Sequence, residues 1–301
     1  MQIALLDAAH AGEIAALMNR TCDLERHRFT PHLIRRRLWD YPYNVPAARL
    51  GAFDAGRLVA VVSGGIKDEQ GLVRLFAVDK AYRRQGLAGR MLAQVEVLLA
   101  DRGAREIVAL YGSPGYFMPG LDPRYTAALC LLQRRGYERT NVVINMAVGL
   151  NGPRRFAPLA DRAERRVLRR AVYLRRAEPT DRPRLQAWIR RHFPGGWETE
   201  VDLTFALHPI PTWIAVRNSA IAGFAIYDVD LFLGGFGPTG VDESLRGSGV
   251  GGALMLRTLA DMQDRGYLEC EIAWVGPVAF YAKVCGARIN RSFWQLRKPV
   301  P

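Results

Sequence analysis

The sequence predicts a mixed α/β fold that is built twice in tandem. Residues 78–92 and 241–255 share an Arg-x-x-Gly-x-small core, and an apolar run precedes each copy while a helix-like segment follows it. The core residues are Arg83, Gly86 and Ala88 in the first copy and Arg246, Gly249 and Gly251 in the second. The length of 301 residues suits two domains, because single domains commonly have about 150 residues.

The two copies stay in register beyond the glycine loop. The spacing between Arg83 and Arg246 is 163 residues, and the same spacing relates the Asp-Arg-Gly sequences at 101–103 and 264–266. A constant spacing over both loop and helix indicates a duplicated structural unit. We therefore expect an N-terminal domain at residues 1–150, a basic linker at 151–172 and a C-terminal domain at 173–301.

The first half contains alternating strand and helix patterns. Apolar residues at helical spacing within 11–20 predict a helix, Pro31 suits the first turn of another, and Asp54-Ala55-Gly56 marks a turn between strands. The expected elements are strands at 3–6, 49–53, 58–66, 72–78, 106–111 and 142–148, and helices at 11–20, 30–38, 88–100 and 126–135.

The second half repeats this order. A hairpin is expected around Arg217-Asn218-Ser219-Ala220, and a glycine-rich strand precedes the second copy of the repeat. The expected elements are strands at 173–176, 213–216, 221–227, 231–241, 268–274 and 289–296, and helices at 181–191, 198–207, 251–265 and 277–285. Each half should be a mixed, mostly antiparallel sheet that helices flank.

The net charge of +13 first suggests a nucleic-acid-binding protein. Its distribution argues against that class, since residues 154–176 hold nine arginines and two acidic residues and alone contribute +7. We interpret this segment as a solvated connecting helix. The remaining positive charge would favour an anionic ligand that carries several phosphates.

The sequence favours a cytoplasmic protein. Its apolar runs are too short to cross a bilayer and charges interrupt them. The N-terminal residues lack the basic region and the cleavage site of a secretory signal. The four cysteines are scattered without a Cys-x-x-Cys pair, which predicts buried thiols in a reducing compartment.

The repeated stretch has the pattern of an anion-binding loop. A strand that runs into a glycine loop and then a helix leaves several backbone N–H groups unpaired at the helix N-terminus. These donors and the positive end of the helix dipole bind phosphate or pyrophosphate. Glycine allows the backbone to approach the anion closely, and arginine adds charge.

A strand, an Arg-x-x-Gly-x-Gly/Ala loop, a helix, another strand and a short Phe-Tyr helix before a glycine resemble the GCN5-related N-acetyltransferase (GNAT) family. The resemblance covers nearly the whole chain, twice. It implies that the strand before each loop binds the pantetheine arm of acetyl-CoA and that the loop amides bind its pyrophosphate. The implied contacts are Val241, Arg246, Gly247, Ser248, Gly249, Val250 and Gly251 in the second half, and Val78, Arg83, Arg84, Gln85, Gly86, Leu87 and Ala88 in the first.

The same resemblance implies a catalytic tyrosine in the second half. Tyr281 matches the family position whose phenol protonates the departing thiolate of CoA, and a tyrosine that only packs one helix face is the alternative. In the first half Leu131 or Leu132 stands there, although Tyr125 and Tyr116 lie nearby in sequence. We therefore expect catalysis in the second half, while the first half binds cofactor without turnover or shapes the substrate cleft.

Acetylation of an amine also requires a proton acceptor. Asp228, Asp230 and Glu198 are the candidates, although each could equally be a solvated carboxylate, and chains of water molecules serve this purpose in the family. The five histidines lack the spacing of a metal site, so no metal is expected.

The predicted function is that of an acetyl-CoA-dependent N-acetyltransferase acting on the primary amine of a small molecule. The sequence from Trp274 to Tyr281 makes an amino sugar one candidate acceptor. The possible walls around Tyr281 are Trp197, Trp213, Trp274 and Phe280, although core packing is the alternative for at least two of them. The alternatives are a non-catalytic acyl-CoA-binding or regulatory module and a nucleic-acid-associated factor. No feature of the sequence predicts an oligomeric state or says which half binds cofactor.

Overall fold

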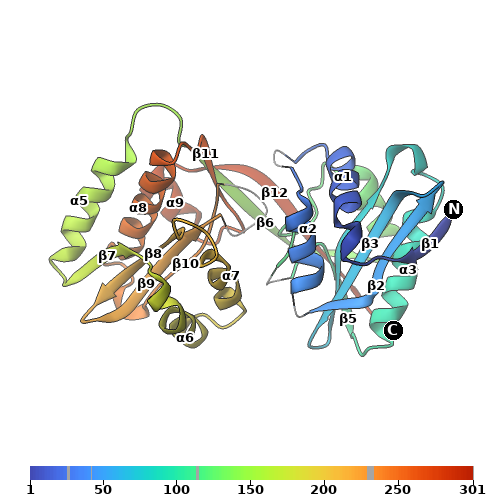
Figure 1. Ribbon diagram of the computed structural model, residues 1–301, viewed down its shortest axis with the longest axis horizontal. Helices are drawn as coiled ribbons and strands as arrows, with labels where there is room; N and C mark the ends of the chain where they lie inside the picture. The colour runs from blue at the N-terminus through green and yellow to red at the C-terminus, as the bar shows by residue number, and fades with distance from the viewer. Residues whose placement is uncertain (26–27, 42, 113–114, 229–233, 301) are drawn as a thin grey trace. The chain divides into compact units, whose positions relative to one another are not determined.

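The computed structural model describes residues 1–25, 28–41, 43–112, 115–228 and 234–300, which form two compact units (Figure 1). Unit 1 contains residues 1–143 and 292–301, and unit 2 contains residues 144–291. The limits of the two units differ from the domain limits expected from the sequence, because β6 (Glu138–Gly149) and β12 (Arg288–Pro299) each contribute residues to both units. Residues 146–149 of β6 pair with a strand of unit 2, and residues 296–299 of β12 pair with a strand of unit 1.

Unit 1 contains a mixed sheet with the strand order β1-β2-β3-β4-β5-β12. Its neighbours are antiparallel except β4 and β5, which are parallel. The strands are β1 (Gln2–Leu5), β2 (Asn44–Asp54), β3 (Arg57–Lys67), β4 (Gln70–Val78) and β5 (Glu106–Ala109), and the helices are η1 (Ala8–His10), α1 (Ala11–Thr21), α2 (Pro31–Arg35), η2 (Arg36–Asp40), η3 (Lys80–Tyr82), α3 (Leu87–Ala100) and α4 (Thr126–Arg134).

Unit 2 contains a sheet of matching design, with the order β6-β11-β10-β9-β8-β7 and one parallel pair, β10 with β11. Its strands are β7 (Val172–Arg176), β8 (Thr212–Arg217), β9 (Ala220–Tyr227), β10 (Gly235–Val241) and β11 (Glu269–Ile272), and its helices are α5 (Phe156–Leu168), η4 (Pro179–Asp181), α6 (Arg182–His192), α7 (Trp197–Thr204), η5 (Glu243–Leu245), α8 (Val250–Asp264) and α9 (Val278–Cys285). The prediction of two mixed, mostly antiparallel sheets flanked by helices is confirmed.

The spacing of 163 residues extends into the strands. Val78 pairs with Ala60 in unit 1, and Val241 pairs with Gly223 in unit 2. The last parallel pairs, Val73 with Ala109 and Phe236 with Ile272, have the same spacing. The duplication therefore fixes hydrogen-bond register as well as the order of elements.

Both faces of the unit 1 sheet are packed. A Cβ atom on Gly64 of β3 would lie 2.7 Å from Val95 of α3, whereas one on Gly65 would lie 3.2 Å from the Cδ of Arg74. Because successive residues of a strand point to opposite faces, α3 covers one face and Arg74 points to the other. On that face Arg74 contacts Arg37 of η2 and Tyr41, the residue that follows η2.

The basic segment between the repeats forms α5, one face of which is buried in unit 2. Phe156, Ala160 and Val167 are buried, and α5 packs on α8. Arg257 of α8 forms ion pairs with Asp161 and Glu164 of α5. The segment therefore contains an integral helix of unit 2, although seven of its arginines are exposed, as expected for a solvated face: Arg154, Arg155, Arg162, Arg165, Arg166, Arg169 and Arg170.

Three local expectations differ from the structure. The helix predicted at 30–38 ends at Arg35, and a π-helical turn continues to Asp40. The glycine-rich strand predicted from Leu231 begins at Gly235, and residues 229–233 lie outside the described residues. Cys270 and Cys285 are buried as predicted, whereas Cys130 is exposed. In the described part of the chain, no helix is long and apolar enough to span a membrane.

Candidate active site

The central strands of each unit separate at the same point. In unit 1, β4 and β5 are paired up to Val73 and Ala109, and beyond that point residues 74–78 of β4 no longer pair with β5. A bulge accompanies the separation, because Val73 pairs with Gly64 and Leu75 pairs with Ser63, which leaves Arg74 as the extra residue. In unit 2 the corresponding bulge lies between Phe236 and Thr239.

The loop after β4 presents unpaired amides, as predicted. Asp79 caps η3 by accepting a hydrogen bond from the amide of Ala81, and Gly86 adopts φ +74° immediately before α3. The amides of residues 84–89 donate to no described residue. Six backbone donors at the N-terminus of a 14-residue helix form an anion site.

The second loop repeats this geometry. Asp242 caps η5, and Gly249 adopts φ +95° before α8. Among the described residues, the amides of 247 and 249–252 find no acceptor, while the amide of Ser248 donates to Leu245. All fourteen residues that the sequence assigns to cofactor contacts therefore lie at the ends of β4 and β10 and in the two loops.

The arginine of each repeat, Arg83 or Arg246, interacts with other residues of the chain. Arg83 donates from Nε to the carbonyl of Val78 at 3.0 Å and from Nη2 to that of Thr21 at 3.4 Å. Arg246 forms an exposed ion pair with Glu243. Arg83 therefore fixes the end of β4 against α1, and the amides are left as the principal donors for an anion.

A cavity of about 1450 Å³ opens in unit 1 where β4 leaves β5. Its walls are residues 74–78 of β4, the loop residues 82–84 and 86–89, the segment 21–25 after α1, residues 120–122 and 124–128, and Leu131. The open edge of β4, the unpaired amides and Tyr125 thus face one space. Small-ligand pockets are typically about 300–1,000 Å³, so this cavity can accommodate a long cofactor together with an acceptor.

In unit 2 an aromatic ring covers the corresponding strand. Gly240 is the counterpart of Ala77, and a Cβ atom on Gly240 would lie 2.5 Å from the Cζ of Phe193. Phe193 is the C-cap residue of α6, and its counterpart, the C-cap residue of α1, is Cys22, which lines the cavity of unit 1. The ring of Phe193 therefore occupies space that a smaller side chain leaves open in unit 1.

Phe193 is held by other aromatic residues. It stacks on Trp197 with ring centroids 5.3 Å apart, and it contacts Trp188 and Phe224 at centroid distances of 5.7 and 6.1 Å. The bulge of unit 2 also has Pro238 where unit 1 has Leu75. Proline has no N–H, so residue 238 of β10 donates no backbone hydrogen bond.

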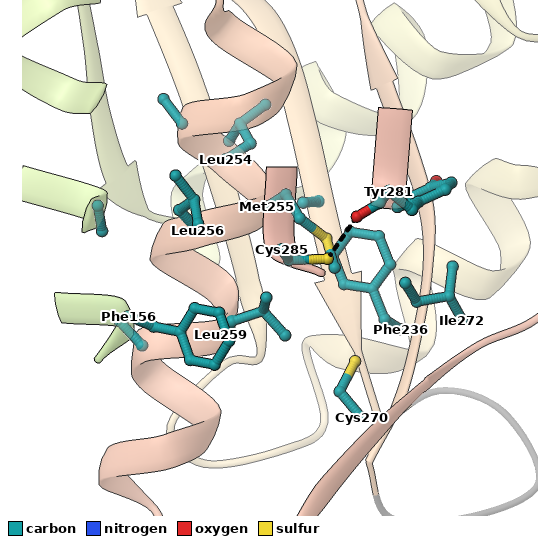
Figure 2. Close-up of a cluster of buried hydrophobic side chains, with 14 of the residues drawn as sticks. Phe156, Phe236, Leu254, Met255, Leu256, Leu259, Cys270, Ile272, Tyr281 and Cys285 are labelled. Carbon is teal, nitrogen blue, oxygen red and sulfur yellow. Dashed lines mark hydrogen bonds between the residues drawn. The ribbon is translucent and has the colours of Figure 1, made fainter. Parts of the chain in front are cut away.

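Tyr281 lies in the hydrophobic core of unit 2 (Figure 2). Its ring is 7% exposed and packs edge-to-face on Phe236 and Phe280, at centroid distances of 6.3 and 5.0 Å. The dashed line in Figure 2 joins the Cys285 thiol to the Tyr281 carbonyl. Burial raises the pKa of the Tyr281 phenol to about 12, and its hydroxyl makes no hydrogen bond with a described residue.

The predicted acid and bases of unit 2 are not joined by any interaction in the described part of the chain. Asp228 accepts hydrogen bonds from the amide of Gly234 at 2.7 Å and from the hydroxyl of Tyr267, and burial raises the pKa of its carboxyl. Glu198 lies in the first turn of α7, and its buried Oε2 has no partner among described residues. Asp230 lies outside the described residues.

The aromatic wall expected around Tyr281 is formed only in part. Phe280 contacts Tyr281, but Trp197 packs on Phe193. Trp213 donates to Asp261 at 3.2 Å and stacks against Arg176.

Unit 1 holds two residues that the sequence analysis missed. Glu25 lines the cavity, and its Oε1 lies 3.4 Å from the hydroxyl of Tyr125, which also accepts a hydrogen bond from the amide of Leu24 at 3.1 Å. Arg74 lies in the middle of the buried strand β4 and lines the same cavity. An arginine inside the apolar run of β4 was the available signal for Arg74, whereas nothing local distinguished Glu25 from a solvated carboxylate.

Comparison with known proteins identifies the family. The model of the acetyltransferase (GNAT) family matches residues 15–114 and 182–287, more than half of the chain. The chain belongs to the GNAT family. Both matched regions contain one copy of the strand, glycine loop and helix described above, so the two units are tandem GNAT repeats. A search of curated proteins found no match.

Solved structures share the fold at low sequence identity. A GCN5-related glucosamine N-acetyltransferase region of a fungal multi-domain GH3 β-N-acetylglucosaminidase is 19% identical with a TM-score of 0.76; the match covers 98% of this chain and 38% of that one. A GCN5-related N-acetyltransferase from Sphaerobacter thermophilus is 17% identical (TM-score 0.71, 99% and 95% covered). A tandem GNAT protein from the clavulanic acid biosynthesis pathway is 14% identical (TM-score 0.71, 100% and 99% covered).

Proposed function

We propose that this chain is an acetyl-CoA-dependent N-acetyltransferase that acetylates a primary amine of a small molecule, and that transfer takes place in the cavity of unit 1. The observation that carries the proposal is the meeting of three features in one space: the separated edge of β4, the unpaired loop amides and a phenol. The expectation from sequence placed catalysis in unit 2, and the open cavity moves our preference to unit 1.

The donor set of unit 1 fits acetyl-CoA. The amides of residues 84–89 would bind the pyrophosphate, and the unpaired edge of β4 from Arg74 to Val78 would bind the amide groups of the pantetheine arm. Acetyl-CoA supplies an acetyl group activated as a thioester.

Glu25 and Tyr125 can move the two protons that the reaction requires. As the amine nitrogen bonds to the acetyl carbon, Glu25 accepts the proton that the nitrogen loses. As the carbon–sulfur bond breaks, Tyr125 donates its phenolic proton to the departing sulfur. The contact of 3.4 Å between Glu25 and Tyr125 then lets the proton pass from carboxyl to phenolate, which restores both groups.

Unit 2 is a second candidate for the same reaction. The observation that favours it is the Tyr281 hydroxyl, which has no hydrogen-bond partner among described residues and would be available to a thiolate. The raised pKa keeps the phenol protonated at neutral pH. In this alternative Asp228 or Glu198 would accept the proton of the amine, the second loop would bind the cofactor, and Phe193 would have to leave Gly240.

The test is thiol release from acetyl-CoA with a panel of amines that includes glucosamine and its oligomers, aminoglycosides, polyamines, amino acids and a lysine peptide. Amine-dependent thiol release would support the enzyme, and glucosamine turnover would support the amino-sugar acceptor. Acetyl-CoA binding without release across the panel would instead favour the non-catalytic acyl-CoA-binding module.

A further inference from the structure

Arg74 is a buried arginine without an acidic partner. Its side chain is 4% exposed, and no carboxylate of the described residues forms an ion pair with it. Its Nη2 donates to the carbonyls of Gly115 and, at 3.5 Å, of Arg37, while Nε is buried without a partner. Nη1 makes no hydrogen bond with a described residue.

This arrangement is costly for the free protein. A buried charge is expensive unless an opposite charge and hydrogen bonds compensate it. Burial together with the like charge of the Arg37 guanidinium lowers the pKa of Arg74 to about 10. Arg74 therefore stays charged at neutral pH, in surroundings that add positive charge.

The position of Arg74 is specific within the cavity. It is the extra residue of the β4 bulge, directly after the last pair between β4 and β5. Its guanidinium lies 5.8 Å from the ring centre of Tyr41, on the face opposite α3. The counterpart in unit 2 is Gly237, so the duplicated unit does not require a cation at this place.

We propose that Arg74 binds a carboxylate of the acceptor, so that the substrate is a small amine that also carries a carboxyl group. This inference rests on the proposed function, whose acceptor it narrows. A guanidinium N–H forms a strong, charge-assisted hydrogen bond with a carboxylate oxygen, and Nη1 of Arg74 has no acceptor among the described residues. The bound carboxylate supplies the missing negative charge and places the amine beside the separated strands.

The experiment compares matched amines on the full chain. Each pair has the same amine with and without the carboxylate: an amino acid and its carboxamide, and muramic acid and its carboxamide. The wild type should prefer the carboxylate member by about 10-fold or more in kcat/KM, the size expected for a charge-assisted hydrogen bond. Arg74→Met should abolish this preference, mainly through a higher KM.

Arg49→Met is the matched control. Arg49 is also buried in unit 1, donates to the carbonyl of Leu38 and stacks on Trp39, but it does not line the cavity. Arg49→Met should keep the preference. Arg74→Met should unfold at the same temperature as wild type or at a higher one, because it removes an uncompensated charge.

The outcomes separate this inference from the proposed function. Equal turnover of both members of each pair, or a preference that survives Arg74→Met, overturns the carboxylate site and leaves the acetyltransferase intact. Preference for phosphoethanolamine over every carboxylate amine also overturns it. If no amine is turned over, calorimetric binding of N-acetyl amino acids decides: binding lost in Arg74→Met supports the site, and no binding to wild type overturns it.

Discussion

At corresponding places on their central strands, unit 1 has Ala77 and unit 2 has Gly240 beneath the ring of Phe193. The residue at the C-cap of the corresponding helix accounts for this difference, since it is Cys22 after α1 in unit 1 and Phe193 after α6 in unit 2. The loops are otherwise similar, with the same glycine conformation and mostly unpaired amides, although the amide of Ser248 in unit 2 donates to Leu245. A unit that keeps the anion-binding loop therefore does not necessarily keep an open site for the cofactor.

The largest expected difference in kcat is between variants of the two tyrosines. Tyr125→Phe should lower kcat for thiol release by about 100-fold or more, the range of general acid catalysis. Tyr281→Phe should change it by less than about 3-fold, because that hydroxyl has no partner to lose among described residues. The reverse pattern, with Tyr281→Phe inactive and Tyr125→Phe active, would return the chemistry to unit 2.

The next largest difference, in acetyl-CoA binding, is expected between variants of the two loop glycines. Gly86→Ala and Gly249→Ala each force a side chain into a left-handed backbone conformation, at a cost of about 1–2 kcal/mol. Both should lower the unfolding temperature. Only Gly86→Ala should weaken acetyl-CoA binding, by about 10-fold, in isothermal titration. Equal weakening by both variants would show that both loops bind the cofactor.

Phe193→Ala tests whether the ring of Phe193 prevents cofactor binding at β10 of unit 2. The change removes the ring from Gly240 and should destabilise the chain by less than the about 3–5 kcal/mol of a fully buried Phe→Ala change, because Phe193 is only partly buried. Titration should then show a second acetyl-CoA site. A folded variant that binds the same number of cofactor molecules as wild type would refute this role for Phe193.

The smallest expected effect is a difference in how two carboxyl groups, one in each unit, change the stability of the fold with pH. Burial raises the pKa of Asp228 in unit 2, so the folded chain binds its proton more tightly than the unfolded chain, and stability falls as pH rises through the folded pKa. The hydrogen bond from Arg20 lowers the pKa of Asp79 in unit 1, so its contribution is present above the unfolded pKa and is lost as pH falls through the folded one.

Unfolding temperatures between about pH 3 and 7 test this pair. Relative to wild type, Asp228→Asn should become more stable as pH rises, and Asp79→Asn should become less stable. Parallel curves for the two variants would contradict the assigned environments. The effect of Asp79 should be modest, because its partner Arg57 is 61% exposed.

The sequence predicted much of the fold because the duplication is local. Glycines that must adopt positive φ, aspartate caps and apolar runs each act within a few residues, and so both loops were found at Gly86 and Gly249. The strands that cross unit boundaries were predicted as strands, but their partners β5 and β11 are distant in sequence and no local pattern specifies them.

The candidate site was less predictable because it depends on tertiary contacts. Tyr125 and Glu25 are 100 residues apart, and only the fold brings them together. Phe193 looked like an ordinary loop residue, and nothing in its neighbourhood indicated that it covers Gly240. Loops that bind anions through backbone amides can thus be predicted from sequence. Whether another side chain covers the edge of a strand cannot be predicted in this way.

The most direct test of the account is hydrogen–deuterium exchange of the backbone amides with and without acetyl-CoA. Unpaired amides exchange fast unless a ligand accepts their hydrogen bonds. The account predicts protection of residues 74–78 and 84–89 in unit 1 and unchanged exchange at 247–252 in unit 2. Protection confined to residues 247–252 would contradict it and would place the cofactor in unit 2.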